Sequence, residues 1–476
     1  MEQSDQTVKI LEVLHVAPPL ESVANSFSLS LTFFDLLWLR SPPPQIIFFY
    51  EFSHPPTVFF DSALPNLKQS LSLTLYHFIP LAGTLTWPHN SHKPIINYIP
   101  GYDSVSLTIA ESNTQNFRHL SGTNNLCGVT ECHPLLPNLT ISHEKASLLS
   151  IQVTLFPNSG FCIGITLHHV VMDGKTFTSF MKSWAYISCS MLRGDQSLLS
   201  TSTAVPLPEY LTPFFDRNVI KDPTGIAAVY LNEWLKQDGG PNNRSLMVED
   251  LKVIPDELRG AFELPGSNIE KLRQLVITKL KVKKVKHYLS NFTLTCAFVW
   301  FCLVKAQQEE LIKHLNVAFS FTVDCRSRLE PPISSSYFGN CVGFKEIVVN
   351  TKAVLGKDGF IVVVEALSNA VRSLGYGWLL SKAKTWVSPT FNLQSDSFRR
   401  LGAAGSDKFD NYSVDYGWGR PNKVEMTSID KTGSVCFGGK GNGGVEVNVV
   451  LKKHEMEAFA SHFVEGLKST DSISRL

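Results

Sequence analysis

The residues best suited to chemistry in this chain are His169 and Asp173, which lie within residues 168–174, HHVVMDG. A neutral imidazole can accept the proton of a hydroxyl group and so allow its oxygen to attack an acyl carbon. The sequence contains no GxSxG element around a nucleophilic serine and no CxxC pair. The pattern therefore suggests acyl transfer promoted by one histidine, with no covalent intermediate on the protein.

Two predicted elements position this histidine. Residues 161–167, FCIGITL, form an apolar run that predicts a buried strand. Downstream, apolar residues recur at helical spacing and predict a helix: Phe177, Phe180, Met181, Trp184 and Ile187. Adjacent strand residues point to opposite faces, so only one of the two histidines can face a site between these elements.

The spacing of His169 and Asp173 is a weak signal by itself, because the chain contains 14 histidines. The alternative interpretation is an ordinary core histidine that is satisfied by a backbone carbonyl. A doubled histidine before two valines, followed by Asp-Gly and an amphipathic helix, is far rarer than the bare spacing. This context favours the functional interpretation.

Composition restricts the class of protein. A chain of 476 residues predicts two domains, and 43% hydrophobic with 18% charged residues predicts a well-buried globular protein. A formal net charge of +1 argues against nucleic acid or an anionic membrane as a partner. No stretch is long and apolar enough to span a bilayer, and the first residues do not resemble a signal peptide. Nine scattered cysteines indicate free thiols in a reducing compartment, so we expect a soluble cytoplasmic protein.

Residues 194–222 are rich in serine and proline and lack periodicity, so we predict a crossover linker between domains at 1–193 and 223–476. Residues 64–78 carry a helical stripe that Pro80 ends, and residues 445–449 alternate as a strand before a closing helix over 456–467. Strands and helices mix in both halves, which predicts an α/β class. The histidines and cysteines show no usual ligand spacing, so no metal site is expected.

A second block lies near the C-terminus, where residues 415–421 read DYGWGRP. Two aromatic residues between glycines predict a tight turn in which the backbone approaches another element closely. We interpret Asp415, Gly417, Trp418 and Gly419 as a structural motif.

Together these blocks resemble the BAHD family of plant acyl-CoA-dependent acyltransferases, in which HxxxD lies near mid-chain and DFGWG near the C-terminus. Here Tyr416 replaces the phenylalanine. Three further blocks support the resemblance across the chain: LTFFD at 31–35, PLAG at 80–83 and YFGNC at 337–341. The last is typical of the branch that acylates anthocyanins and other phenolic glycosides.

The resemblance implies two chloramphenicol-acetyltransferase-like domains with a solvent channel between them and His169 midway along it. It implies that His169 is the base and that His168 packs behind the site. It also implies that Asp173 turns away from the channel and pairs with an arginine of residues 323–329, VDCRSRL. The sequence leaves open whether Arg326 or Arg328 is that partner. Oxyanion donors are expected near Gly402–Gly405 or at Ser406 because of their place upstream of residue 415.

The resemblance further implies a reaction without a cofactor, in which malonyl-CoA is the acyl donor and the sugar 6-hydroxyl of a flavonoid, isoflavonoid or related phenolic glucoside is the acceptor. Lys175 is the candidate partner of the malonyl carboxylate, although a solvated lysine in the first helical turn is the alternative. A hydroxycinnamoyl donor such as coumaroyl-CoA and a non-catalytic acyl-CoA-binding or phenolic-binding relative remain open. A peptide-synthetase condensation domain also carries HHxxxDG, but it would lack the 415–419 block. We expect a monomer.

Overall fold

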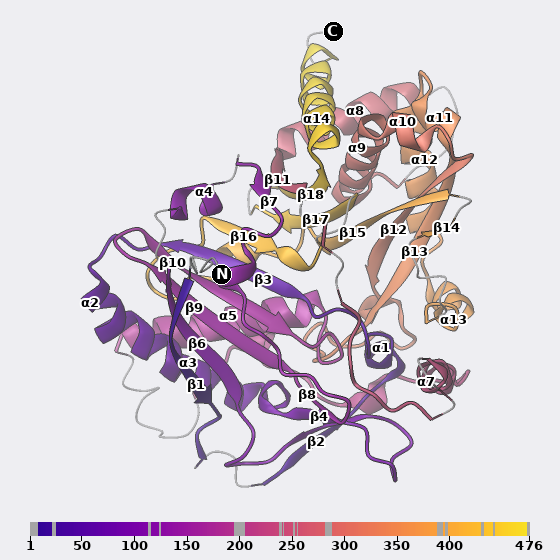
Figure 1. The fold of residues 1–476 in the computed structure, drawn as a ribbon. Coiled ribbons are helices and arrows are strands. Elements are labelled where there is room, and N and C mark those ends of the chain that lie inside the picture. Colours follow the sequence, from indigo (N-terminus) through magenta and orange to yellow (C-terminus); the bar gives the residue numbers. More distant parts are fainter. Residues whose placement is uncertain are drawn as a thin grey trace, which may run out of the picture.

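The computed structural model describes residues 8–20, 25–112, 116–122, 125–194, 205–237, 240, 242–250, 253–254, 256–280, 288–387, 394–395, 398–429, 433–440 and 443–473. Within these ranges the strands form three sheets, arranged in two bodies that lie side by side (Figure 1). No described helix is long and apolar enough to cross a membrane.

The first sheet contains five strands of the N-terminal half together with β16. Its order is β1 (Val8–Val16), β6 (Val105–Ser112), β9 (Leu149–Phe156), β10 (Gly160–Leu167), β3 (Gln45–Glu51) and β16 (Lys423–Met426). Every residue of β9 and β10 is buried, as expected for central strands covered on both faces. Helices α3 (Leu64–His77) and α5 (Gly174–Leu192) pack against each other beside this sheet.

The second sheet belongs mainly to the C-terminal half. Its order is β13 (Val342–Asn350), β12 (Asn316–Asp324), β15 (Phe398–Ser406), β17 (Ser434–Gly439), β18 (Val445–Lys452), β11 (Glu257–Leu264) and β7 (Cys127–Gly128), and β14 (Gln394–Ser395) pairs with β15. A group of mutually packed helices gathers next to it, at the upper right of Figure 1: α8 (Gly266–Leu280), α9 (Asn291–Ala306), α12 (Gly359–Arg372) and α14 (Lys453–Ile473).

The remaining elements are short. A third sheet has the order β2 (Phe27–Ser30), β5 (Ile95–Tyr98), β4 (Thr84–Thr86) and β8 (Lys145–Ser147). The other α-helices are α1 (Phe33–Leu36), α2 (Pro56–Val58), α4 (Phe117–Ser121), α7 (Ile226–Lys236), α10 (Gln308–Leu311), α11 (Thr351–Leu355) and α13 (Tyr376–Ala383).

Each of the two large sheets contains one strand from the other half of the chain. Strand β16 pairs antiparallel with β3, and β7 pairs antiparallel with β11. The halves are therefore joined by backbone hydrogen bonds as well as by the crossover. The domain bounds 1–193 and 223–476 stay a prediction, and the strand exchange crosses them in both directions.

The described part of the predicted linker, residues 205–222, packs against the C-terminal half. Phe214 forms a parallel bridge with Tyr337, and its backbone bonds Ser336 and Phe338 at 2.9 Å each. Residues 195–204 lie outside the described residues. The segment thereby carries the side chain of Arg217 towards residues 337–338.

Several elements expected from periodicity are confirmed. The predicted strand over 161–167 is β10, and the helix that follows it is α5. The stripe over 64–78 is α3, which ends before Pro80. Residues 445–449 lie in β18, and the closing helix is α14.

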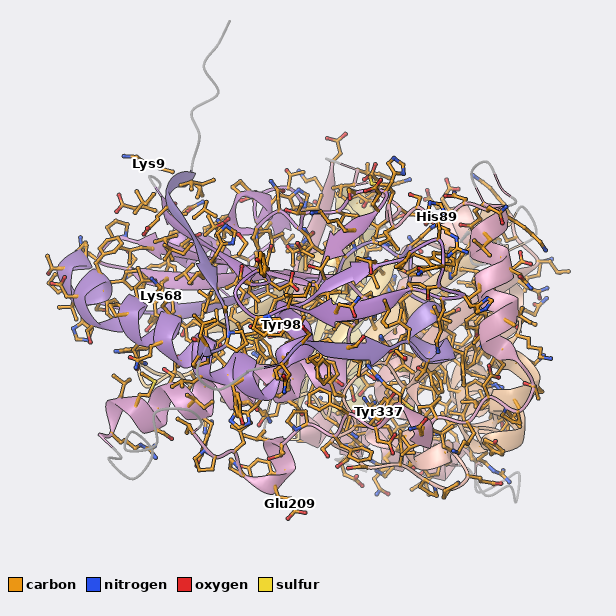
Figure 2. All side chains as sticks on the ribbon, turned by 90° about the horizontal axis from the view of Figure 1, so that it is seen from below. Lys9, Lys68, His89, Tyr98, Glu209 and Tyr337 are labelled. Atoms are coloured by element: carbon orange, nitrogen blue, oxygen red, sulfur yellow. The ribbon has the colours of Figure 1, made fainter. Side chains whose placement is uncertain are left out.

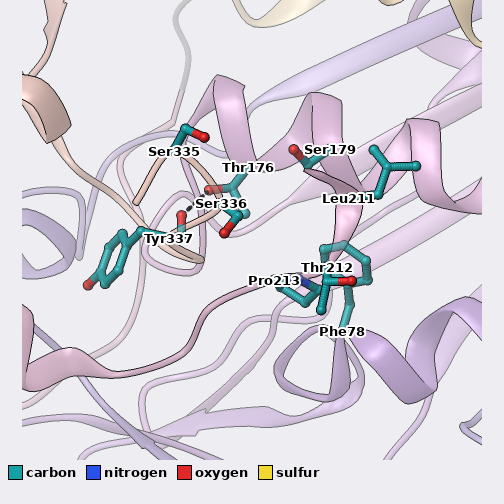
Figure 3. Close-up of a pocket in the computed structure, with 9 residues that line it drawn as sticks. All are labelled: Phe78, Thr176, Ser179, Leu211, Thr212, Pro213, Ser335, Ser336 and Tyr337. Atoms are coloured by element: carbon teal, nitrogen blue, oxygen red, sulfur yellow. Dashed lines mark hydrogen bonds between the residues drawn. The ribbon is translucent and has the colours of Figure 1, made fainter. Parts of the chain in front are cut away.

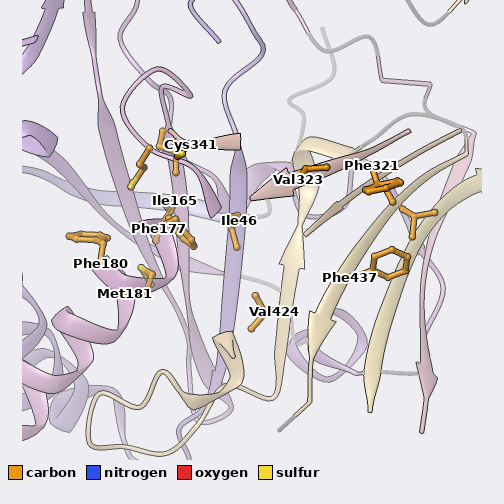
Figure 4. Close-up of a cluster of buried hydrophobic side chains, with 14 of the residues drawn as sticks. Ile46, Ile165, Phe177, Phe180, Met181, Phe321, Val323, Cys341, Val424 and Phe437 are labelled. Carbon is orange, nitrogen blue, oxygen red and sulfur yellow. The ribbon is translucent and has the colours of Figure 1, made fainter. Parts of the chain in front are cut away.

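One continuous apolar core extends through both halves. Figure 4 shows Ile165 and Phe177 on one side of Ile46 and Val424, with Phe321 and Phe437 beyond them. Side chains fill the space between the elements, while Lys9 and Glu209 lie at opposite edges of the molecule (Figure 2). The nine cysteines are all free, and eight of them are buried.

Candidate active site

The two histidines lie just beyond the end of β10. The His168 backbone N–H still donates to the Leu148 carbonyl at 3.0 Å, and the chain then turns, with the Val171 N–H donating to the His168 carbonyl at 3.2 Å. Helix α5 begins at Gly174 with Asp173 as its N-cap. Strand, turn and capped helix together fix the backbone of His169.

The imidazole of His169 is held between aromatic and polar neighbours. The ring of Trp38 stacks on it with centroids 3.8 Å apart and planes 9° from parallel. The Asn340 side chain donates to the His169 carbonyl at 2.9 Å. Nδ1 of His169 is buried and has no hydrogen-bond partner among the described residues. Burial lowers the pKa of His169 to about 4, against a smaller opposing effect of the Asp173 carboxylate, so the ring is neutral at pH 7.

His168 has a different environment from its neighbour. Its side chain is fully buried, and its Nδ1 accepts the Val170 backbone N–H at 3.3 Å. Burial, with a small contribution from His169, lowers the pKa of His168 to about 3. His168 is therefore a neutral packing residue, and His169 is the half-buried member of the pair.

Asp173 is 2% exposed and binds Arg326 through both carboxylate oxygens. The Arg326 guanidinium donates to Oδ2 at 2.8 Å and to Oδ1 at 3.2 Å. Backbone N–H groups of Cys341 and Thr176 complete the shell, each at 3.0 Å. Burial opposes the charge of Arg326, but Asp173 more than offsets it and raises the pKa of Arg326. Among the described residues, Asp173 makes no hydrogen bond to His169, so its geometry is that of an organiser.

The other candidate arginine and the candidate acyl-carboxylate lysine both meet Asp324. Arg328 donates to the Asp324 carbonyl, and in the described part of the chain its side chain makes no hydrogen bond to Asp173. Lys175 Nζ lies 3.3 Å from Asp324 Oδ2, with about a third of the lysine side chain exposed. Asp324 also contacts Arg326 at 3.2 Å. Lys175 is therefore ion-paired at the edge of the site.

The loop of residues 337–341 brings the sequence blocks together. Asp35 accepts the Asn340 backbone N–H at 2.9 Å and its side-chain amide at 3.2 Å. Arg217 donates to the Tyr337 hydroxyl and the Phe338 carbonyl at 2.6 Å each, and lies 3.8 Å from Asp35. The loop thus connects residues 31–35, the crossover segment and the turn that carries His169.

A small cavity lies against the first turn of α5. Figure 3 shows it between the helix, the crossover segment and the loop before Tyr337, and the cavity volume is about 10 Å³, enough for one water molecule. The Thr176 hydroxyl donates to the carbonyls of Gly339 at 3.1 Å and Tyr337 at 3.4 Å. The cavity is too small for a substrate and belongs to the packing around the Asp173 cap.

Residues 415–419 form a turn built on one carboxylate. Asp415 Oδ1 accepts the backbone N–H groups of Gly417 at 2.8 Å and Gly419 at 3.0 Å. Both glycines have positive φ, 104° and 108°. A Cβ at Gly417 would lie 2.4 Å from the end of the Leu192 side chain, which would have to move. Trp418 packs half-buried against the core. Hydrogen bonds to Asp415 and the packing of Trp418 hold this turn, and the structural role of the motif stays a prediction.

Tyr416, where the family motif has phenylalanine, is fully buried. Its ring makes edge contacts with Trp184 at 4.9 Å and Tyr50 at 5.8 Å. Its hydroxyl has no hydrogen-bond partner in the described part of the chain. The ring therefore does the packing, and the hydroxyl adds a buried polar atom.

The expected oxyanion donors lie in or at the end of a strand. Gly402–Gly405 belong to β15, which pairs in parallel with β12 and β17. The Ser406 hydroxyl contacts Asp407 at 3.3 Å and accepts the Lys408 N–H at 3.2 Å. Sheet pairing and local bonds thus occupy this segment, and an oxyanion role for it stays a prediction.

One group of potential metal ligands lies away from these residues. Single ligand atoms of His119, Cys127 and Glu131 all lie within 4.8 Å of one another. His119 Nε2 is 2.9 Å from Glu131 Oε2 and 3.7 Å from the Cys127 sulfur. Sequence spacing did not indicate this group, and its mutual contacts account for its arrangement.

Sequence reasoning missed three residues around His169. Asn340 lies within residues 337–341 and Trp38 lies just after residues 31–35, but the sequence did not indicate that either contacts His169. Arg217 lies in the segment predicted as a linker. No local sequence pattern links these three residues, because they come from positions more than 100 residues apart along the chain.

Comparisons with known proteins agree with this arrangement. A model of the Transferase family matches residues 7–465. Malonyl-CoA:anthocyanidin 5-O-glucoside-6''-O-malonyltransferase of Arabidopsis thaliana is 40% identical, covering 98% of this chain and 99% of that protein. Phenolic glucoside malonyltransferase 1 of Arabidopsis thaliana is 37% identical over the same shares.

The crystal structure of vinorine synthase superposes with a TM-score of 0.66 at 18% identity, covering 95% of this chain and 96% of that one. At this identity the likeness concerns the fold alone. It confirms the predicted α/β, chloramphenicol-acetyltransferase-like class.

Proposed function

The chain belongs to the BAHD family of acyl-CoA-dependent acyltransferases, and from this premise we propose that it transfers the malonyl group of malonyl-CoA to a sugar hydroxyl of a phenolic glucoside. We assign the sugar 6-hydroxyl of a flavonoid, isoflavonoid or related glucoside as the acceptor. The observation that carries the proposal is the neutral, half-buried His169 at the strand–helix junction. The names of the relatives support the choice of donor and acceptor class.

In this proposal His169 is the general base. Because Nδ1 is buried, Nε2 is the nitrogen that reaches the substrates. It accepts the proton of the acceptor hydroxyl as that oxygen attacks the thioester carbonyl, and a C–O bond forms. The tetrahedral intermediate then collapses with breakage of the C–S bond. The thiolate leaves in preference to the alkoxide because a thiol has a pKa of about 8.5. It takes up the proton held by His169, which restores the neutral base.

Asp173 contributes to this chemistry indirectly. Its oxygens are occupied by Arg326 and two backbone N–H groups, so it is not free to relay a proton. It caps α5 and fixes Arg326, which in turn donates to the Tyr337 and Gly339 carbonyls at 3.1 and 3.2 Å. We assign Asp173 to holding the loop whose Asn340 binds the His169 backbone.

The donor carboxylate requires a cation, and Lys175 is our candidate. Its ammonium lies against Asp324 at 3.3 Å, so binding malonate there requires the lysine to exchange that partner. The partial exposure of both side chains makes this exchange feasible, because half-exposed ion pairs are worth about 0–1 kcal/mol.

We further propose that the protein acts as a monomer in the cytoplasm, and that acyl-CoA and glucoside reach His169 through the predicted channel between the two halves. Nine free cysteines without any disulfide support a reducing compartment.

The test is an acceptor-dependent thiol-release assay. Malonyl-, acetyl- and coumaroyl-CoA are each offered with phenolic glucosides and with their aglycones. Turnover with malonyl-CoA on glucosides alone supports the proposal. Preference for coumaroyl-CoA would overturn the donor assignment and leave the family unchanged. Tight ligand binding without turnover on the whole panel would favour a non-catalytic binder.

A further inference from the structure

Trp38 is the side chain in closest ring contact with His169. The indole and imidazole stack face to face, with ring centroids 3.8 Å apart and planes 9° from parallel. No other aromatic side chain in the described residues is paired with this imidazole. Contact over a whole ring face fixes the plane of the imidazole and excludes water from that side.

The segments that carry Trp38 and Asn340 are both fixed by the buried side chain of Asp35. Asp35 Oδ2 accepts the backbone N–H and the hydroxyl of Thr32 at 2.9 and 2.8 Å, which fixes the turn that carries Trp38. The backbone N–H of Trp38 also donates to the backbone carbonyl of Asp35 at 3.0 Å. Asp35 Oδ1 binds Asn340, which holds the His169 backbone. The ring and the backbone of His169 are thus positioned from the same point.

Trp38 also contacts an aromatic side chain of the C-terminal half. Phe344 lies 5.1 Å from the indole, tilted by 51°, and Trp386 packs next to Phe344 at 6.3 Å. This packing supports the indole from the C-terminal half.

We propose that Trp38 is the positioning residue of the base: its indole face holds the His169 imidazole in the plane that Nε2 needs and shields that face of the ring from water. The proposal rests on His169 acting in the proposed function. An imidazole that is already held in its reactive orientation loses no further rotational freedom when the acceptor hydroxyl arrives. Such fixed placement of the base accelerates the proton transfer.

The charged groups around His169 are accounted for. Asp173 is the carboxylate that acts on it from α5, and it is neutralised by Arg326. His168 is neutral because its pKa is lowered to about 3. Asp35, reached through Asn340, has Arg217 at 3.8 Å. A smaller residue at position 38 therefore changes mainly the access of water to the face of the His169 ring that Trp38 covers.

The experiment compares Trp38→Leu, Trp38→Phe and the control Phe344→Leu with the wild type. The readouts are the NMR titration of the His169 ring protons, assigned with His169→Gln, and the pH dependence of kcat/KM. We expect Trp38→Leu to raise the pKa of His169 by at least about one unit towards its ordinary value of 6.5, because water gains access to the ring. We expect kcat/KM to fall about tenfold, because the imidazole is no longer held in its reactive orientation. Trp38→Phe keeps an aromatic face, and Phe344→Leu leaves the imidazole covered, so both should titrate like the wild type.

The proposal would be overturned if a folded Trp38→Leu variant kept the wild-type pKa of His169 by NMR and the wild-type acid limb in the pH dependence of kcat/KM. If that variant does not fold, the wild type decides: a stacked indole shifts the His169 ring protons upfield, and ordinary shifts would overturn the proposal. The NMR readout needs no substrate. Failure of the malonyl-transfer reaction in the wild type would therefore be distinguishable from failure of the role of Trp38.

Discussion

The pairing of Asp173 with Arg326 makes a quantitative prediction about stability. Removing one partner of a buried ion pair leaves the other charge uncompensated, which costs about 3–5 kcal/mol. In Asp173→Ala the stranded guanidinium keeps Asp324 at 3.2 Å, so we expect a loss near the lower end, about 3 kcal/mol. The change also removes the N-cap of α5, which is worth about 1 kcal/mol.

Three further variants separate these contributions. Asp173→Ser retains a capping hydroxyl but not the charge, so we expect it to recover about 1 kcal/mol relative to Asp173→Ala. The Arg326→Ala variant should lose a similar amount to Asp173→Ala. Arg328→Ala, on the same turn, should change the free energy of unfolding by less than about 0.5 kcal/mol, because its side chain donates to the Asp324 carbonyl and, among the described residues, forms no ion pair.

The assay is equilibrium unfolding in urea, followed by circular dichroism and tryptophan fluorescence. The double variant Asp173→Ala/Arg326→Ala should be less destabilised than the sum of the single variants by about 1–3 kcal/mol, because no charge is left stranded. Full additivity, or an Asp173→Ala variant as stable as the wild type, would refute the organising role of the pair.

Three other predictions concern single positions. The folded-state pKa of His168, about 3, lies below its unfolded value of 6.5, so the unfolded state binds more protons in acid and stability falls as pH drops from about 6.5 towards 3. We expect the wild type to lose about 2 kcal/mol more than His168→Gln between pH 7 and pH 5, and parallel unfolding curves would contradict this. Tyr416→Phe removes an unpartnered buried hydroxyl and should raise the free energy of unfolding by about 1 kcal/mol; a destabilised variant would reveal a partner for that hydroxyl. Lys175→Ala should raise KM for malonyl-CoA about tenfold and leave KM for acetyl-CoA unchanged, and equal changes for both donors would exclude Lys175 as the carboxylate partner.

The sequence predicted the elements around the site better than the contacts between them. Strand β10 and helix α5 followed from apolar periodicity because each buries a continuous face. The partner of Asp173 remained open because Arg326 and Arg328 lie two residues apart in a short 3-10 turn, where small differences in direction decide burial.

Long-range pairing was beyond the sequence for a physical reason. Strands β16 and β7 are only four and two residues long, too short for a periodic signal, and each pairs with the opposite half. Arg217 lies in a proline-rich segment without periodicity. Its structural role follows from its hydrogen bonds to the Tyr337 hydroxyl and the Phe338 carbonyl. Such residues are identified by the contacts that the folded chain creates.

The most direct measurement of the central claim is the rate of glucoside-dependent thiol release from malonyl-CoA by the wild type and by His169→Ala, both shown to be folded. General-base catalysis by one histidine contributes about 10²–10⁴-fold, so the variant should lose at least about a hundredfold in kcat and retain its acyl-CoA affinity. The wild-type rate should also be independent of pH between about 6 and 8, because the pKa of His169 is about 4. A His169→Ala variant that transfers malonate at a rate close to the wild type would contradict the assignment of His169 as the base.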